Sequence, residues 1–162
     1  MKHNEITRIN NHEKQILDYI VKVASHVSTK KEVKEITKLH ENLGDIMRIT
    51  EISDNFTKYT NKEVNNNLSF SNKVKEDLRK MHDYTQEMSE LTKKIFLGEN
   101  KDAILKIDKI EEKVDEMRSK MMNDHIARLN SGECKAESSS IFINLVSNIE
   151  RLADHITYIA HS

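Results

Sequence analysis

The sequence predicts an all-α fold, an antiparallel up-and-down bundle of about five helices in one domain over residues 1–162. Three observations support this prediction. The 162 residues include no proline and three glycines, so few positions interrupt a helix. A charged fraction of 33% beside an apolar fraction of 36% is typical of long helices that bury narrow stripes. Apolar residues recur at alternating steps of three and four, which is the spacing of one helix face.

The first two helices are predicted over residues 4–27 and 30–65. Between them, Thr29 precedes Glu32 by three residues, the spacing of a capping box in which each residue bonds the other's backbone N–H. The mostly polar residues 65–69 then break the apolar periodicity. The second helix is therefore expected to end near residue 65.

The third helix is predicted over residues 71–97, with Ser71 as its N-cap and Gly98 as its C-terminal stop. Its apolar stripe comprises Val74, Leu78, Met81, Met88, Leu91 and Ile95, with Thr85 filling the gap. We interpret the methionines on the stripes as flexible filler of the core.

The fourth and fifth helices are predicted over residues 101–130 and 136–161. Asn100 is expected to cap the fourth, and Gly132 is expected to stop it. The stripe of the fourth comprises Ala103, Ile107, Ile110, Val114, Met117 and Met121. That of the fifth comprises Phe142, Leu145, Ile149, Leu152, Ile156 and Ile159. Because the connections are short, sequential helices should pair as antiparallel hairpins.

Charge and hydropathy exclude several classes of protein. The 26 basic and 27 acidic residues are interleaved, without the basic cluster of a nucleic-acid-binding protein, so we expect no nucleic-acid partner. No apolar run reaches the roughly 18 residues of a membrane-spanning helix, and the first ten residues lack an apolar signal core. Cys134 is the single cysteine, so no internal disulfide can form. We expect a cytoplasmic chain, or the cytoplasmic part of a larger membrane protein.

Two pairs of carboxylates flank the seam between the last two helices. Glu111 and Asp115 lie four residues apart, as do Glu150 and Asp154, so each pair shares one helix face. Counted from Gly132, Asp115 and Glu150 lie at nearly equal distances along the chain, and so do Glu111 and Asp154. At about 1.5 Å of rise per residue, these residues reach matching heights. The four carboxylates are therefore predicted to converge across the hairpin.

A carboxylate cluster admits two interpretations. A divalent or trivalent cation relieves the repulsion among its members, and oxygen ligands suit Mg, Ca, Mn or iron, and zinc to a lesser degree. Alternatively, Lys113, Arg118 and Arg151 neutralise the acids on a solvated helix flank.

The sequence offers no enzyme signature. Ferritin-like di-iron bundles use Glu-x-x-His motifs, and none of the eight histidines follows a glutamate at that spacing. His125 and His155 each follow an aspartate and could assist a metal, although we favour partly exposed polar roles for both. No nucleophile–base arrangement or glycine-rich phosphate loop can be assembled. A metal-dependent phosphohydrolase is therefore the least favoured class.

A weak internal repeat relates the second helix to the fifth. The segment "GDIMRITEISDNF" aligns with "SNIERLADHITYI", which matches Ile46 with Ile149. The preceding helices also align loosely, "INNHEKQI" with "VDEMRSKM". The repeat predicts two related units, of which the first, residues 1–66, lacks a helix that the second, residues 67–162, has.

The fifth helix carries a family motif. "NIERLADHITYIA" resembles the motif N-x-E-R-I-G-D-H-x-x-N-I-A of the PhoU family of phosphate-uptake regulators. "HIARLNSGEC" and the spacing from "EEKVD" onward are most similar to one branch. That branch is the PhoU-like cytoplasmic C-terminal region of bacterial Na⁺/phosphate cotransporter-related proteins. The resemblance is strong from about Leu68 onward and weak before it.

The resemblance implies a pair of three-helix bundles, with the first unit short of its leading helix. It also implies multinuclear iron or zinc bound by Glu/Asp-x-x-x-Asp motifs on the bundle surface. Carried onto this sequence, it makes Glu111, Asp115, Glu150 and Asp154 the expected ligands.

The first unit departs from the family pattern. Met47 stands where the motif has Glu, Ile52 where it has His, and Asn10 where the partner helix offers Asp. Asp45 and Glu51 are weaker candidate ligands. We expect this site to be degraded, which leaves at most one full cluster.

The resemblance implies a non-enzymatic regulatory domain of phosphate transport and phosphate signalling. Its expected partner is a membrane phosphate transporter, its own transmembrane region, or a signalling protein, and a homodimer is compatible with the sequence. A rival of another class is a structural or dimerising helical-bundle signalling module without metal. In that case the acids are flank charges only.

Overall fold

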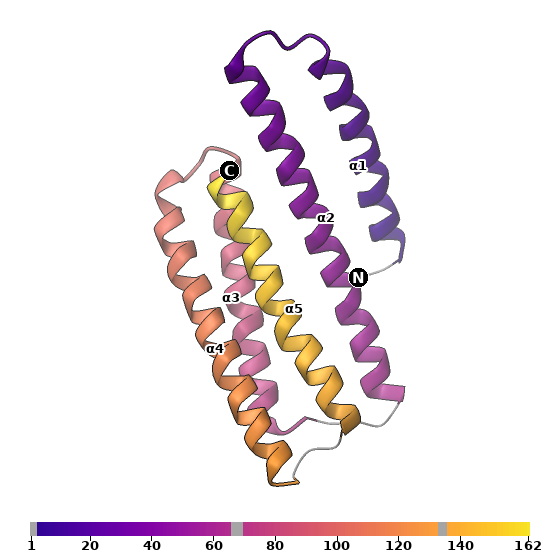
Figure 1. Ribbon diagram of the computed structural model, residues 1–162, viewed down its shortest axis with the longest axis vertical. Helices are drawn as coiled ribbons and strands as arrows, with labels where there is room; N and C mark the ends of the chain where they lie inside the picture. The colour runs from indigo at the N-terminus through magenta and orange to yellow at the C-terminus, as the bar shows by residue number, and fades with distance from the viewer. Residues whose placement is uncertain (1–2, 66–69, 133–135) are drawn as a thin grey trace.

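The computed structural model describes residues 3–65, 70–132 and 136–162. They form five α-helices and one 3₁₀ turn (Figure 1). These are α1 (His3–Ala24), α2 (Lys30–Asn65), α3 (Asn72–Phe96), η1 (Lys101–Ala103), α4 (Ile104–Asn130) and α5 (Ala136–His161). The described ranges contain no strand, which confirms the predicted all-α class.

Helix α5 lies at the centre of the molecule. It contacts α2, α3 and α4, and α3 also packs against α4. Within the described parts of the chain, α1 packs against α2 alone. Figure 1 shows sequential helices running in opposite directions, with the α1–α2 hairpin at one side of the bundle. The predicted antiparallel bundle is therefore confirmed.

The main core fills the space between α3, α4 and α5. The predicted stripes supply it except at one position of α5, where Val146 is buried in the core and the predicted Leu145 is only half-buried. Its fully buried members include Met81, Met88, Ile107, Val114, Phe142 and Val146. Met117 and Met122 pack against this cluster from its edge. The methionines of α3 and α4 thus fill the core, as their spacing predicts.

Local hydrogen bonds fix two helix starts. The Thr29 N–H and hydroxyl donate to Glu32 Oε2 at 2.9 and 2.8 Å, and the Glu32 N–H donates to Thr29 Oγ1 at 3.2 Å. This reciprocal pattern is the predicted capping box. At the start of α3, Ser71 Oγ accepts from the Val74 N–H at 3.3 Å.

Glycines in the left-handed conformation end α3 and α4. Gly98 has φ 76° and Gly132 has φ 75°. After α3, the Glu99 N–H donates to the Lys94 carbonyl at 2.8 Å, and the Gly98 N–H donates to the Ile95 carbonyl at 2.9 Å. This is a Schellman motif, which satisfies the last carbonyls and requires a residue that tolerates positive φ.

Two predicted boundaries differ from the structure. Helix α1 ends at Ala24 instead of residue 27, because the side chains of Ser25 and His26 both bond the Lys22 carbonyl that would continue the helix. Asn100 makes no side-chain cap bond, and the chain enters α4 through the 3₁₀ turn. Cys134 and the break at residues 66–69 lie outside the described residues.

Candidate metal centre

The α4–α5 hairpin positions the candidate site. Glu111 and Asp115 on α4 and Asp154 on α5 each directly follow a buried apolar residue. Each carboxylate therefore emerges at the edge of the seam between the two helices. Glu111 and Asp154 are half-buried, whereas Asp115 is exposed.

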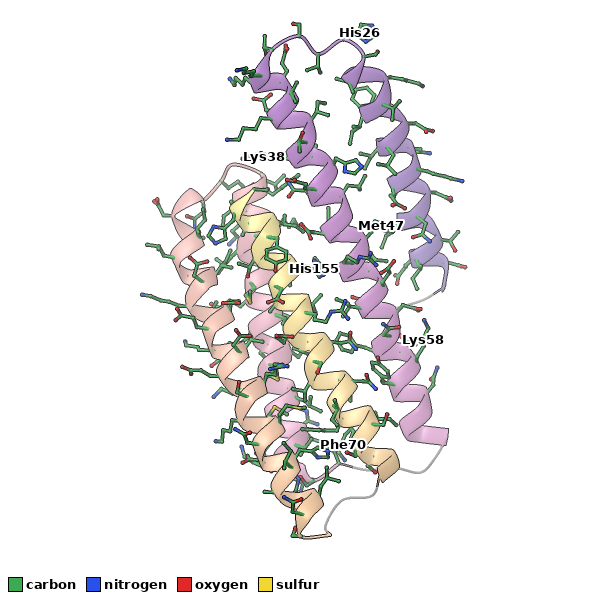
Figure 2. The ribbon with its side chains drawn as sticks, viewed as in Figure 1. His26, Lys38, Met47, Lys58, Phe70 and His155 are labelled. Carbon is green, nitrogen blue, oxygen red and sulfur yellow. The ribbon has the colours of Figure 1, made fainter. Side chains whose placement is uncertain are left out.

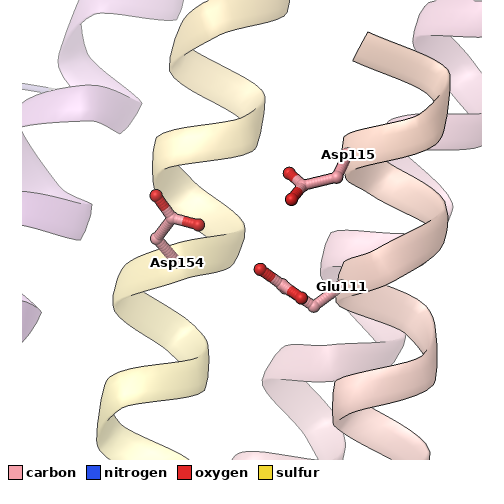
Figure 3. Close-up of side chains that lie close together, drawn as sticks. All are labelled: Glu111, Asp115 and Asp154. Carbon is pink, nitrogen blue, oxygen red and sulfur yellow. The ribbon is translucent and has the colours of Figure 1, made fainter. Parts of the chain in front are cut away.

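Three carboxylates meet across the hairpin. One oxygen from each of Glu111, Asp115 and Asp154 lies within 4.8 Å of the other two. Figure 3 shows Glu111 and Asp115 pointing from α4 toward Asp154 on α5. The arrangement follows from the hairpin register, which brings residues far apart in the sequence to one height.

Burial and mutual repulsion act on these acids in the same direction. Burial raises the pKa of Glu111 above its ordinary value, and the charges of Asp115 and Asp154 raise it further. Burial also raises the pKa of Asp154, and Asp115 adds to the effect. The fold therefore holds these groups together against an electrostatic cost that a bound cation would remove.

Glu150, the fourth predicted ligand, stands apart from this group. Its Oε1 lies 3.7 Å from the Arg118 Nε, in an ion pair between α5 and α4. Burial and then Asp154 raise the pKa of Glu150, while Arg118 lowers it. Arg118 thus neutralises one acid of the predicted four, as the flank interpretation expects. Lys113 instead lies over the Tyr84 ring, 5.7 Å from its centroid.

The weaker candidates of the first unit are not brought together. Asp45 accepts a hydrogen bond from His155 Nδ1 at 2.8 Å, and Glu51 pairs with Arg48 Nη1 at 2.7 Å. Among the residues that the structure describes, neither belongs to a group of three or more potential metal ligands. Both acids are instead engaged by a basic side chain.

The two histidines that follow aspartates have structural roles. His155 projects from α5 toward α2 and ties the two helices through Asp45 (Figure 2). The prediction of a partly exposed His125 is wrong. His125 is buried, shares a hydrogen bond of 2.6 Å with the Ser139 hydroxyl and packs 4.5 Å from the Phe142 ring. Its position four residues after Met121 continues the α4 stripe, a signal that sequence reasoning missed.

The donor set fits a hard cation. All three grouped ligand atoms are carboxylate oxygens, and oxygen donors suit iron, manganese, magnesium and calcium. Three carboxylates leave coordination positions for water or for a further acid. Metal binding at Glu111, Asp115, Asp154 and Glu150 stays a prediction.

Comparison with known proteins identifies the family. A family model described as the PhoU domain matches residues 78–162, more than half of the chain. The match contains α4 and α5 entirely, and with them all three grouped carboxylates. No curated protein and no solved structure matches the chain. Across the described ranges, no helix combines the length and apolarity needed to span a membrane. The chain belongs to the PhoU domain family.

Proposed function

We propose that this protein is a PhoU-type regulatory domain that controls phosphate transport from the cytoplasmic side of a membrane. It acts as part of, or as a partner of, a phosphate transporter of the Na⁺/phosphate cotransporter kind. The observation that carries the proposal is that the PhoU match and the three-carboxylate group coincide on α4 and α5. Family membership gives a phosphate-related regulatory role, and the partner and the metal are the proposed refinements.

The carboxylate group is the proposed metal site, for iron or zinc. A bound cation supplies positive charge that offsets the repulsion among the acids. Glu111 and Asp115 would hold the ion from α4 and Asp154 from α5, so the three ligands would cross-link the two helices. Glu150 lies one turn from Asp154 and pairs with Arg118, so it would supply a fourth ligand only after breaking that ion pair. The braced hairpin then presents a fixed surface to the transporter.

Metal analysis tests the site. Protein purified without chelator is challenged with iron, zinc or manganese, dialysed and measured by elemental analysis. The wild type should retain metal, and Glu111→Gln/Asp154→Asn should lose at least about tenfold in affinity, because two of three charged ligands are gone. Glu112→Gln is the matched control, since Glu112 is exposed and outside the group. Equal retention by wild type and the double variant would show that these acids do not form the site.

Phosphate uptake tests the role. In cells that lack this protein, the wild-type gene should restore the normal repression of phosphate uptake in phosphate-rich medium. The Glu111→Gln/Asp154→Asn variant should fail to do so, and Glu112→Gln should succeed. If the double variant restores regulation fully, metal is unnecessary, and the metal-free helical-bundle module becomes the better interpretation. If the wild type leaves uptake unchanged, the assignment to phosphate transport is wrong.

A further inference from the structure

The α4–α5 hairpin has a third helix packed against one of its sides, and in the part of the chain that the structure describes the α1–α2 hairpin has no such helix on the corresponding side. Helix α3 packs against both α4 and α5. Within the described residues, no helix occupies the corresponding place beside α1 and α2 (Figure 1). The internal repeat allows the two hairpins to be compared position by position.

The repeat alignment matches Ile46 of α2 with Ile149 of α5, and its extension by two helical turns toward the start of each helix matches Leu39 with Phe142. The α5 residues are 2% and 7% exposed, and both belong to the core that α3 helps to form. Leu39 and Ile46 are 47% and 40% exposed. The same helix face is thus apolar in both units but covered in only one.

Helix α1 repeats the pattern. Its Ile16 corresponds to Met121 of α4 in the alignment of the preceding helices. Met121 is 4% exposed within the core, whereas Ile16 is 45% exposed. Both helices of the first hairpin therefore leave uncovered an apolar position that the second unit buries.

These positions lie on one side of the hairpin. Val23 and Leu39 line a common groove of about 220 Å³ near the turn between α1 and α2. Ile16 lies seven residues before Val23, and Ile46 lies seven after Leu39, which is two turns along the same face in each helix. Because the helices are antiparallel, both continuations run away from the turn. We call the strip formed by Ile16, Val23, Leu39 and Ile46 the open groove.

We propose that a second copy of this chain covers the open groove, so that two α1–α2 hairpins pack face to face as a four-helix bundle. None of the four positions carries a charge, but Glu32 and Glu35 also line the groove at its turn end. A two-fold axis that runs the two hairpins in opposite directions keeps these acids of the two copies at opposite ends of the contact. Large apolar side chains left exposed along one face of a helix pair are typical of an interaction surface. This inference does not depend on the phosphate or metal proposals.

The size of the hairpin suits a stable dimer. The 22 residues of α1 span about 33 Å, and two packed helices are about 20 Å wide. A contact along the whole of this face would bury roughly 650 Å² per copy, or roughly 1,300 Å² for the pair, at the lower end of the ~1,200–2,000 Å² range of specific interfaces. A smaller patch would be typical of a weak or incidental contact.

Oligomeric state tests the proposal. Light scattering coupled to size exclusion, run from low to high micromolar concentration, should show a dimer of the wild type. Ile16→Glu/Ile46→Glu should weaken dimerisation by at least about 100-fold, because two charges enter the centre of the contact. Val21→Glu is the matched control, since Val21 is exposed on α1 but lies about 140° around the helix from Ile16. It should leave the dimer unchanged.

Cross-linking places the contact. In a Cys134→Ser background, Ile16→Cys should form a disulfide-linked dimer on mild oxidation, and Val21→Cys should not. Circular dichroism of each variant checks the fold, and the side chains of Ile16, Val21 and Ile46 are already exposed. A wild type that stays monomeric at every concentration overturns the proposal. In that case the open groove would be left for a helix of a different protein. A dimer that survives Ile16→Glu/Ile46→Glu also overturns the proposal, because its interface then lies elsewhere.

Discussion

At the scale of single residues, the three grouped carboxylates should destabilise the protein when no metal is bound. We predict that Asp154→Asn, measured by urea unfolding with a chelator present, raises the free energy of unfolding by about 0.5–1 kcal/mol. The reason is that the substitution removes repulsion with Glu111 and Asp115 while keeping the side-chain shape. Glu112→Gln, outside the group, should change stability by much less.

The pH dependence of this gain follows from the raised pKa values of Glu111 and Asp154. Each group costs stability fully above its folded-state pKa, and the cost disappears as the pH falls to its ordinary pKa, 4.5 for Glu111 and 3.8 for Asp154. The advantage of Asp154→Asn should therefore shrink as the pH is lowered from neutral. An advantage that grows on acidification would contradict the proposed repulsion.

His125 should act in the opposite sense. Burial, with Arg128 nearby, lowers its pKa below the ordinary 6.5. As the pH falls through 6.5, the unfolded chain takes up a proton that the folded protein resists, so stability decreases until His125 is protonated in the fold. We predict that His125→Gln is less stable than wild type at alkaline pH but loses less on acidification, as followed by urea unfolding at several pH values. Parallel pH profiles for the two proteins would refute this role.

At the scale of the elements, α2 contains a glycine that the described contacts do not require. A Cβ at Gly44 would meet nothing within 4 Å. Alanine favours a helix interior over glycine by about 1 kcal/mol, so Gly44→Ala should stabilise the chain by about 0.5–1 kcal/mol in urea unfolding. Gly98→Ala is the contrasting control: at φ 76° it should destabilise by about 1 kcal/mol, although a Cβ there also has open space. Loss of stability in Gly44→Ala would mean that α2 needs the glycine for a close approach.

Element boundaries could be predicted where the signal is local. The capping box of Thr29 and Glu32, the Ser71 cap and the stop at Gly98 depend on residues a few positions apart, and all three are as predicted. The end of α1 has no such local signal, because it depends on two side chains, Ser25 and His26, that both bond the Lys22 carbonyl.

The candidate site could be predicted only in part, for a related reason. Helical spacing and the hairpin register correctly bring Glu111 and Asp115 near Asp154. Whether Glu150 joins them depends on the rotamer of Arg118, because Arg118 forms an ion pair with Glu150 across the two helices. Residue spacing carries no information about that choice. The position of His125, four residues after Met121, predicts that it is buried, whereas its polar side chain favours an exposed position.

At the scale of the whole molecule, stability should be unevenly distributed. Helices α3, α4 and α5 share one core, whereas α1 rests on α2 alone in the described chain. We predict that amide hydrogen exchange, measured below the concentration at which copies associate, is fastest in α1 and slowest in α4 and α5. Equal protection across the helices would mean that the molecule opens as one unit.

Two core substitutions separate local from global opening. Met88→Ala removes a fully buried side chain from the main core and should cost about 2–5 kcal/mol, speeding exchange in α3, α4 and α5 together. Ile20→Ala removes a side chain of α1 that is 7% exposed, so it should speed exchange in α1 while leaving α4 unchanged. If Ile20→Ala accelerates α4 as much as α1, the hairpin is part of the global unfolding unit. If α1 instead opens locally, the α1–α2 hairpin is the part of the bundle that a partner on the open groove stabilises most.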